Sequence, residues 1–401
     1  MIKYKISIVI LALLSTSSFA QDIEYWVTLG LENNPTNKAQ KTRIEALEQA
    51  VESTFEWGET HFEVSAIEWM PDNISPYYRP TLSVTQELPW LGSKTIKKNL
   101  AEASIYKQQS ENALLSLILE QKIREQYTEL QYYQSKISLL KTHLEELTHL
   151  YDNLLYRVET GQANAWEVIV LENEINDLQT EISKSNFALA QHIKLFEILI
   201  ATSIEDLKIE ELNMNVDTPK MEISRHPLLA RLEAEQNELE ASQRHLDLDY
   251  APKISIGIHY EAAMPVEPTY LTHDMIMPSL GISIPIFSNK KNSKKKLVTL
   301  QKEAINAEIE LEKNTLNQEI TKVRNALYGL ELQWNSKDIK LQNLQEIRKL
   351  LWSEYEANKI NFQEVNRIEI QAITVELEKL ETNRDFNLQH IYLNYLTNNY
   401  F

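Results

Sequence analysis

A heptad pattern of apolar residues runs through residues 123–154, IREQYTELQYYQSKISLLKTHLEELTHLYDNL. One apolar set recurs every seven residues, at Ile123, Leu130, Ile137, Leu144 and Tyr151. A second set lies between its members, at Tyr133, Leu140, Leu147 and Leu154. Two interleaved apolar positions per heptad form the seam along which helices pack in a coiled coil. The stretch therefore predicts a long helix packed against another helix.

A second tract further along the chain carries the same pattern. Its seam positions are Leu316, Val323, Leu330, Leu344 and Leu351, interleaved with Ile320, Leu327, Trp334 and Leu341. Lys337 and Arg348 occupy the two positions where the apolar pattern is broken. All twelve prolines lie outside residues 90–218 and 286–401. Because proline disrupts helix interiors, both tracts are predicted to be almost entirely helical.

Each tract is predicted to fold back once. Residues 159–164 read ETGQAN and residues 356–361 read EANKIN, an offset of 356 − 159 = 197. Gly161 suits the left-handed backbone beyond a helix end, and Asn358 takes its place because Asn tolerates that backbone best after Gly. Each turn ends on an Asn cap with a Glu three residues later, as in a capping box: Asn164 with Glu167, and Asn361 with Glu364.

The matching turns indicate an internal duplication. Pro35 and Pro227 also correspond, with a similar offset. We predict a signal peptide at 1–20 and two repeats, 21–224 and 225–401. The first holds a helix 22–57, strands 61–70 and 78–88, a long helix 93–158, a helix 164–200 and a linker 201–224. The second holds a helix 226–249, strands 253–262 and 275–286, a long helix 289–357 and a helix 361–398. Each long helix is expected to span ~100 Å.

The first twenty residues have the pattern of a cleaved signal peptide. Lys3 and Lys5 precede an apolar run, residues 6–14, and Ser18-Phe19-Ala20 offers small residues for cleavage. An N-terminal membrane anchor is the alternative, but so short a run falls well below the ~20 residues that cross a bilayer. The chain is therefore expected to be exported.

Composition excludes several classes of protein. With 40 basic and 58 acidic residues the net charge is −18, which disfavours nucleic-acid binding. The chain has no Cys, so disulfides, thiolate metal sites and thiol nucleophiles are excluded. Only seven Gly in 401 residues disfavour glycine-rich phosphate loops. No P-loop or Gly-x-Ser-x-Gly elbow occurs, so we expect neither an enzyme nor a cofactor.

The predicted strands alternate like those of a membrane barrel. Apolar residues occupy every second position, at Ile254, Ile256, Ile258, Tyr260, Ile282 and Ile284, with small or polar residues between them. Aromatic residues stand at the strand ends, as in an interfacial belt: Trp57, Trp69, Tyr77, Tyr78 and Trp90. A half-exposed soluble hairpin is the alternative. Because a membrane barrel needs about eight strands or more, four strands per chain predict closure by identical copies, preferably a trimer with twelve strands.

These features together resemble the TolC family of outer membrane efflux proteins. The likeness rests on the signal peptide, the repeat, the hairpin turns and the segment Gln86-Glu87-Leu88-Pro89-Trp90-Leu91-Gly92 before a very long helix, and it covers essentially the whole mature chain. The Pro-Trp-Leu-Gly version is similar to the CzcC and CusC heavy-metal branch. The resemblance implies a mainly α fold with a small transmembrane β part: a trimeric 12-stranded outer-membrane β-barrel continuing into a periplasmic α-barrel. It also implies a periplasmic adaptor and an inner-membrane pump of RND type as partners.

The resemblance places the periplasmic entrance at the hairpin tips. The residues concerned are Gly161, Asn164, Glu167, Asn358, Asn361, Glu364 and Arg367. Glu364 matches an acidic position of the family, whereas Arg367 stands where a second acid is common. Arg367 is expected to pair with Glu364 or Glu369 across helices. A helix-capping role is the alternative for Glu364.

Other groups have two interpretations each. Lysines follow the second strand of each pair and contact either anionic headgroups or water: Lys94, Lys97 and Lys98, and Lys290, Lys291, Lys294, Lys295 and Lys296. His259 and His273 lack partners at metal-ligand spacing, so no metal site is predicted. The alternatives for the whole protein are a periplasmic coiled-coil scaffold or adaptor without a barrel, and a type I secretion exit duct.

Overall fold

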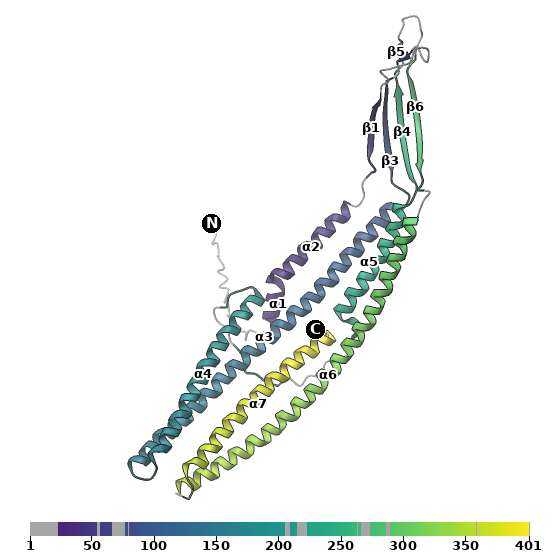
Figure 1. Cartoon of the computed structure of the whole chain (residues 1–401). Helices are drawn as coiled ribbons and strands as arrows, with labels where there is room; N and C mark the ends of the chain where they lie inside the picture. Colours follow the sequence, from purple (N-terminus) through teal and green to yellow (C-terminus); the bar gives the residue numbers. More distant parts are fainter. Residues whose placement is uncertain are drawn as a thin grey trace, which may run out of the picture. The chain divides into compact units, whose positions relative to one another are not determined.

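The structure, a computed structural model, is mainly α-helical with a small β part, which confirms the predicted fold class (Figure 1). It describes residues 23–53, 57–65, 77–78, 80–204, 209–214, 223–262, 264–265, 273–285, 289–357 and 359–400. The helices are α1 Ile23–Asn33, α2 Pro35–Glu52, α3 Ser93–Glu159, α4 Ala165–Ile200, the short η1 Ile223–Arg225, α5 Pro227–Asp249, α6 Asn289–Glu356 and α7 Phe362–Thr397. The strands are β1 Thr60–Ser65, β2 Tyr77–Tyr78, β3 Thr81–Leu88, β4 Lys253–Glu261, β5 Met264–Pro265 and β6 Met275–Ser283. The predicted signal peptide lies outside these residues.

The elements of the two halves correspond in order and in length. Helices α3 and α6 have 67 and 68 residues, and α4 and α7 have 36 each. In each half the long helix turns back into the shorter one, so that α3 with α4 and α6 with α7 form two helical hairpins (Figure 1). Within the described ranges, no helix is both long enough and apolar enough to cross a bilayer.

The first helix differs from the prediction. In place of one helix over residues 22–57, the chain forms α1 and α2, with a break at Asn34. Pro35 has no N–H to continue the hydrogen-bond ladder, and it begins α2 at the position where proline is tolerated. The Asn34 side chain donates to the Leu199 carbonyl oxygen at 2.9 Å, which ties the break to α4.

The strands also begin and end differently from the predicted ranges. β1 covers 60–65, and the rest of the predicted strand 61–70 lies outside the described residues. The predicted strand 78–88 is divided, because Tyr78 belongs to β2 and β3 begins at Thr81. β6 ends at Ser283, so Ile284 lies just beyond the strand. Pro285 follows it, and a residue before proline favours an extended backbone that mimics strand continuation.

Four strands form an antiparallel sheet in the order β1-β3-β4-β6 (Figure 1). The pairing joins the two repeats at its centre, where β3 of the first half pairs with β4 of the second. Ile258 lies opposite Val84, and Ile256 lies opposite Leu280. Because opposed residues share a face, most apolar positions of the four strands lie on one face and most polar positions on the other, with Gln86 on the apolar face and Met275 and Met277 on the polar one.

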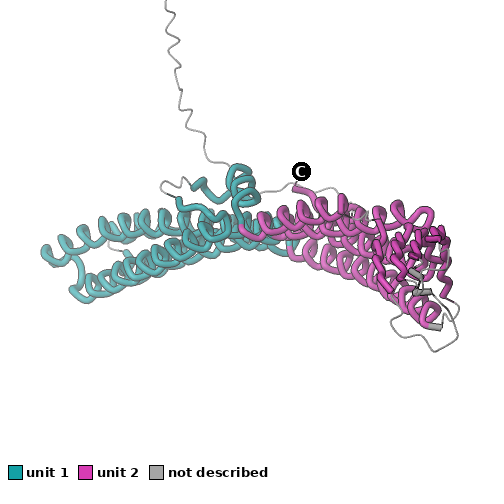
Figure 2. The backbone as a smooth tube through the Cα atoms, turned by 90° about the horizontal axis from the view of Figure 1, so that it is seen from above, with its two compact units in different colours: residues 1–34, 119–216, 327–391 teal, residues 35–118, 217–326, 392–401 magenta. Residues whose placement is uncertain are grey.

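The chain divides into two compact units, each built from parts of both repeats (Figure 2). Unit 1 combines residues up to 34 with 119–216 and 327–391, and it contains both hairpin turns. Unit 2 combines residues 35–118, 217–326 and 392–401, and it contains the sheet. The predicted repeats, 21–224 and 225–401, therefore do not coincide with the compact units, each of which draws on parts of both.

Apolar clusters stabilise unit 1 along its helices. One cluster joins α1, α3 and α4 through Trp26, Val27, Leu119, Ile123, Tyr127, Leu130, Phe196 and Ile200. Residues 209–214 of the predicted linker pack on α7, where Asn383 and Asn387 donate to the carbonyl oxygens of Leu212 and Asn213 at 2.8 and 3.0 Å. The heptad positions Ile123, Leu130 and Leu140 are fully buried, as the seam prediction requires.

In unit 2, α5 packs against α6, and His226 fixes the start of α5. A cluster of Leu232, Ile305 and Ile309 joins the two helices. His226 is fully buried and caps α5, because its Nδ1 accepts from the Leu228 N–H at 3.2 Å while its Nε2 donates to the Tyr395 carbonyl oxygen at 3.2 Å. Burial lowers the pKa of His226 and outweighs the opposing hydrogen bond to Tyr395. The ring is therefore kept neutral, with its proton on Nε2.

Candidate functional site: the tips of the helical hairpins

The first tip is a tight turn between α3 and α4. Gly161 has a φ of +76°, in the left-handed region that favours glycine. Asn164 is the N-cap residue of α4, but its side chain accepts no cap hydrogen bond. Its amide instead lies 3.4 Å from the Glu167 Oε1, as donor to the carboxylate. The predicted capping by the Asn164 side chain is therefore wrong at this tip, because Glu167 is buried and takes up the amide.

The second tip has the expected cap. The Asn361 Oδ1 accepts from the Glu364 N–H at 3.3 Å, so this side chain caps α7. The Lys359 N–H donates to the Glu354 carbonyl oxygen at 2.9 Å and closes the end of α6. Asn358, the predicted counterpart of Gly161, lies outside the described residues.

Glu364 and Arg367 form an exposed pair on α7. The Arg367 Nη2 lies 3.1 Å from the Glu364 Oε2, and both side chains are at least half exposed. Glu364 is thus one of the two predicted partners of Arg367, but the pair lies within α7 rather than across helices. Glu369 is bound instead by Arg348 of α6, with 2.7 Å between Nε and Oε1. The carboxylate of Glu364 therefore remains at the surface beside a cation.

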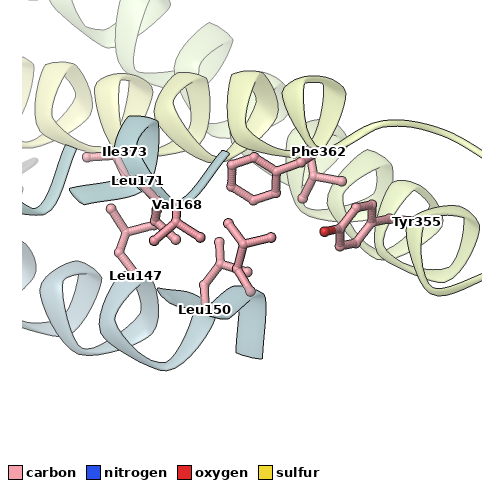
Figure 3. Packing of buried hydrophobic residues seen from close by; sticks show 9 residues of the cluster. Leu147, Leu150, Val168, Leu171, Tyr355, Phe362 and Ile373 are labelled. Atoms are coloured by element: carbon pink, nitrogen blue, oxygen red, sulfur yellow. The ribbon is translucent and has the colours of Figure 1, made fainter. Parts of the chain in front are cut away.

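Below the tips, one apolar cluster joins the two hairpins (Figure 3). Its buried members are Leu147, Leu150, Leu154, Val168, Leu171, Tyr355, Phe362, Val365 and Ile373. Figure 3 shows Phe362 and Tyr355 of the second hairpin approaching the leucine and valine side chains of the first. The tips are thus held together by burial of apolar surface, which contributes roughly 25 cal/mol per Å².

A cavity of ≈ 470 Å³ lies between the two tips. Its lining comes from both hairpins: Arg157, Gly161, Gln162, Ala163, Asn164, Glu167, Tyr355, Ile360, Asn361 and Phe362. The Arg157 guanidinium stacks over the Tyr355 ring, with its Cζ 4.1 Å from the ring centroid. Burial raises the pKa of Tyr355, and the positive charge of Arg157 opposes this shift. Glu167 is 4% exposed, and its Oε2 has no hydrogen-bond partner within the described part of the chain.

A polar network also links the hairpins, next to that cluster. His143 of α3 lies 2.7 Å from Glu376 of α7, measured from Nε2 to Oε2. Glu146 of α3 binds Arg348 of α6 at 3.2 Å, and the Trp352 Nε1 donates to the Glu369 Oε1 at 2.9 Å. Burial opposes the charging of His143, but the hydrogen bond and charge of Glu376, aided by Glu146, raise its pKa. The two hairpins are therefore joined by charge as well as by apolar packing.

The sequence contained a signal for part of this network. Arg348 and Lys337 interrupt the apolar heptad of α6, and each has a specific partner on α7. Arg348 binds Glu369, and Lys337 donates to the Thr382 hydroxyl at 2.8 Å. A cation at a seam position needs such a partner, because an unpaired charge is costly to bury. His143 and Glu376 offered no comparable signal, since neither interrupts an apolar pattern.

The sheet presents the predicted apolar positions on one exposed face. Side chains on this face include Ile256, Ile258 and Ile282, exposed by 46%, 59% and 62%. Ile254 is half-buried, and Ile284 is exposed beyond the end of β6. On the opposite face Gly257 allows close approach, because a Cβ there would lie 2.7 Å from the Ser279 hydroxyl oxygen. The polar face is thus the crowded one, lined by small side chains.

The predicted aromatic positions are only partly described. Trp57 and Trp90 are exposed near the strand ends, by 67% and 36%. Tyr78 has its backbone in β2, paired with Met264, and Trp69 lies outside the described residues. His259 hydrogen-bonds across the strands to Ser279 at 2.9 Å. Within the ranges that the structure describes, no three His, Asp or Glu side chains are grouped to hold a metal ion.

Solved structures of outer membrane channels share this architecture. CusC, from a study of folding and transmembrane channel formation, is 14% identical, with a TM-score of 0.76 over 94% of this chain and 92% of CusC. The outer-membrane channel OprN is 12% identical, with a TM-score of 0.75 over 94% of this chain and 90% of OprN. The open-state MtrE channel of Neisseria gonorrhoeae is 14% identical, with a TM-score of 0.72 over 93% of this chain and 88% of MtrE. The chain has the outer membrane channel fold.

Among the comparisons with known proteins, only the structural one finds this channel fold. No protein-family model matches the sequence, and no curated protein matches it. The resemblance that the turns, the repeat and the Gln86–Gly92 segment suggested is confirmed at the level of the fold. At such low identity the likeness assigns an architecture, and the role of each residue must be argued from its own surroundings.

Proposed function

We propose that this protein is the outer membrane exit duct of a tripartite efflux system, carrying substrate from the periplasm to the exterior. The sheet is the observation that carries the proposal. It has an exposed, mainly apolar face and a mainly polar opposite face, as a membrane barrel needs toward lipid and toward water. The channel fold supports the same conclusion.

The edges of the sheet support closure by identical copies. In the order β1-β3-β4-β6, the strands β1 and β6 each have one neighbour in the described sheet. Their free edges carry unpaired backbone groups, which cannot be left in lipid. A second copy can satisfy them by pairing its β1 with β6 of the first. Three copies supply twelve strands, enough for a water-filled interior, and we therefore propose a homotrimer.

The hairpin tips then form the periplasmic entrance. A polar network and an apolar cluster join the hairpins at this end, and these contacts must rearrange for helices to part. The assigned entrance residues are Gly161, Asn164, Glu167, Asn358, Asn361, Glu364 and Arg367. The proposed partners are a periplasmic adaptor and an inner-membrane pump of RND type, which meet the duct at this end.

Fractionation and conductance test the proposal. The protein should remain with the outer membrane after salt and alkaline washing, migrate as a heat-resistant trimer, and open ion-conducting pores in planar bilayers. A periplasmic scaffold or adaptor would be released by the wash and would not conduct. Heavy-metal cations are the proposed substrate class, because the Pro89-Trp90-Leu91-Gly92 segment is similar to that of the heavy-metal branch. A deletion strain should become sensitive to such cations, whereas loss of protein export instead would indicate a type I secretion duct.

A further inference from the structure

The start of α6 carries a charge opposite to that of the chain. Residues 289–296 contain five lysines and no acid, in a protein with a net charge of −18. The first turn of α6 has no acidic residue, and neither has the first turn of α3, which carries Lys94, Lys97 and Lys98 nearby. The amino end of a helix favours negative charge and disfavours cations. Both long helices therefore begin with lysines that the helix itself does not favour.

Two of the five lysines form ion pairs within the fold, and the Nζ of a third, Lys294, lies 6.0 Å from the centroid of the Tyr250 ring. The Asp247 carboxylate of α5 binds Lys291 and Lys295, at 3.1 and 2.6 Å from their Nζ atoms. Hydrogen bonding by Lys295 lowers the pKa of Asp247, so this carboxyl stays charged. The Lys291 Nζ also lies 5.7 Å from the centroid of the Tyr250 ring. These contacts fix the position of the α6 start against α5.

The other three lysines, Lys290, Lys294 and Lys296, are exposed. They follow the end of β6 closely along the chain, where Ile282 and Ile284 are exposed by 62% and 61%. All of these residues belong to unit 2, so their arrangement lies within one compact unit. A cationic group thus lies next to the edge of the apolar sheet face, at the depth where a membrane presents its headgroups.

We propose that Lys290, Lys294 and Lys296 bind the phosphates of anionic phospholipid headgroups, in the leaflet that adjoins the helical part of the molecule. This inference rests on the proposed membrane function and adds a lipid partner to it. The occupant follows from charge complementarity and from continuity with the apolar face, which binds acyl chains where the lysines bind headgroups. Lys291 and Lys295, held by Asp247, position the three binding lysines.

The experiment compares thermal unfolding of the purified trimer in vesicles of two compositions. One set contains phosphatidylcholine alone, and the other contains phosphatidylcholine and phosphatidylglycerol in equal amounts. The anionic lipid should raise the unfolding temperature of the wild type, and Lys290→Gln/Lys294→Gln/Lys296→Gln should lose most of that rise. Each lysine near an anionic surface is expected to change lipid binding about five-fold. The rise should also shrink at high salt, because exposed charges are screened.

A matched variant and a soluble anion sharpen the result. Lys340→Gln/Lys349→Gln/Lys359→Gln removes the same charge from exposed lysines of unit 1 and should keep the full lipid effect. Inorganic phosphate should not reproduce the effect, and if it does so equally, the partner is a free anion and the lipid proposal is overturned. An equal rise in wild type and the first triple variant also overturns it. Trimers that insert normally but show no lipid preference refute this inference alone, whereas absence of insertion refutes the proposed function.

Discussion

His143 of α3 and Glu376 of α7 form a contact of 2.7 Å between residues 233 positions apart in the chain. Both side chains lie in unit 1, and they join the first hairpin to the second. Glu146 faces the other ring nitrogen of His143 at 3.5 Å, and Arg348 of α6 binds Glu146. The imidazole therefore lies between two carboxylates, and Arg348 binds one of them, Glu146.

The His143 contact predicts a pH dependence of stability. The folded-state pKa is raised, so the contribution of the pair is complete below about pH 6.5, the ordinary value for His, and is lost as the pH rises through the folded-state pKa. We expect His143→Gln to destabilise the protein by about 1–2 kcal/mol at about pH 5 and by less at about pH 8.5. Denaturant unfolding of the wild type and the variant at both pH values measures the difference.

His149 provides the control for that measurement. It lies on α3 and is exposed, so His149→Gln should leave the unfolding free energy nearly unchanged at both pH values. A destabilisation of equal size at acid and alkaline pH in His143→Gln would show that the ring contributes by packing rather than by charge.

Arg348 tests the ion pair beside the tips. The Glu369 side chain is 5% exposed and is bound by Arg348 and Trp352. Arg348→Met leaves that carboxylate buried without its cation, a change that typically costs about 3–5 kcal/mol. The double change Arg348→Met/Glu369→Met removes both charges and should recover most of the stability. Chemical unfolding of the wild type and the two variants measures the free energy of unfolding. An equal loss of that free energy in the single and double variants would contradict the pairing.

His226 should respond to pH in the opposite direction. Its folded-state pKa is lowered, so its contribution is complete above about pH 6.5 and is lost as the pH falls through the folded-state value. A proton on Nδ1 would point at the Leu228 N–H, from which Nδ1 now accepts a hydrogen bond. His226→Asn keeps a cap without a titrating group and should flatten the loss on the acid side, whereas His226→Ala should lose about 1 kcal/mol above about pH 6.5 and less at acid pH. Parallel profiles of unfolding free energy against pH in the wild type and the Asn variant would show that His226 does not cause the acid loss.

Patterns of close spacing made much of the fold predictable. The heptads from Ile123 and Leu316 repeat over many turns and mark both long helices, and the two turns share Asn and Glu at the same offsets. Alternation in residues 253–261 predicts β4, and the register confirms which side chains share its apolar face. These features depend on neighbours a few residues apart, which a single sequence displays.

Features that depend on distant partners were missed. Nothing local pairs His143 with Glu376, and nothing near Asn164 indicates that Glu167 is buried against the second hairpin. The break at Asn34 was missed although Pro35 was visible, because apolar and helix-favouring residues continue on both sides. For His143 and Glu167 a tertiary contact decides the arrangement, whereas the break at Asn34 follows from Pro35 itself.

The lipid-facing assignment of the sheet predicts a strong effect of charge. Ile256 is exposed on the apolar face of β4, so Ile256→Arg should place a cation toward lipid at a cost of ~2–4 kcal/mol. The amount of heat-resistant trimer in membranes should fall, which electrophoresis without full denaturation measures. His259→Arg puts a cation on the opposite face of the same strand and should assemble more fully. Normal trimers in Ile256→Arg would contradict the assignment.

Glu364 and Arg367 together predict how the entrance selects ions. Their side chains are exposed and lie 3.1 Å apart, so the cation offsets the carboxylate. If the three copies present this pair at the entrance, Arg367→Gln leaves Glu364 uncompensated and should raise cation selectivity in planar bilayers. Glu364→Gln should lower it, and the double variant should lie between them. Because Asn361 caps α7 through the Glu364 backbone N–H, neither substitution removes that cap. Unchanged reversal potentials in both single variants would show that this charge pair lies away from the ion path.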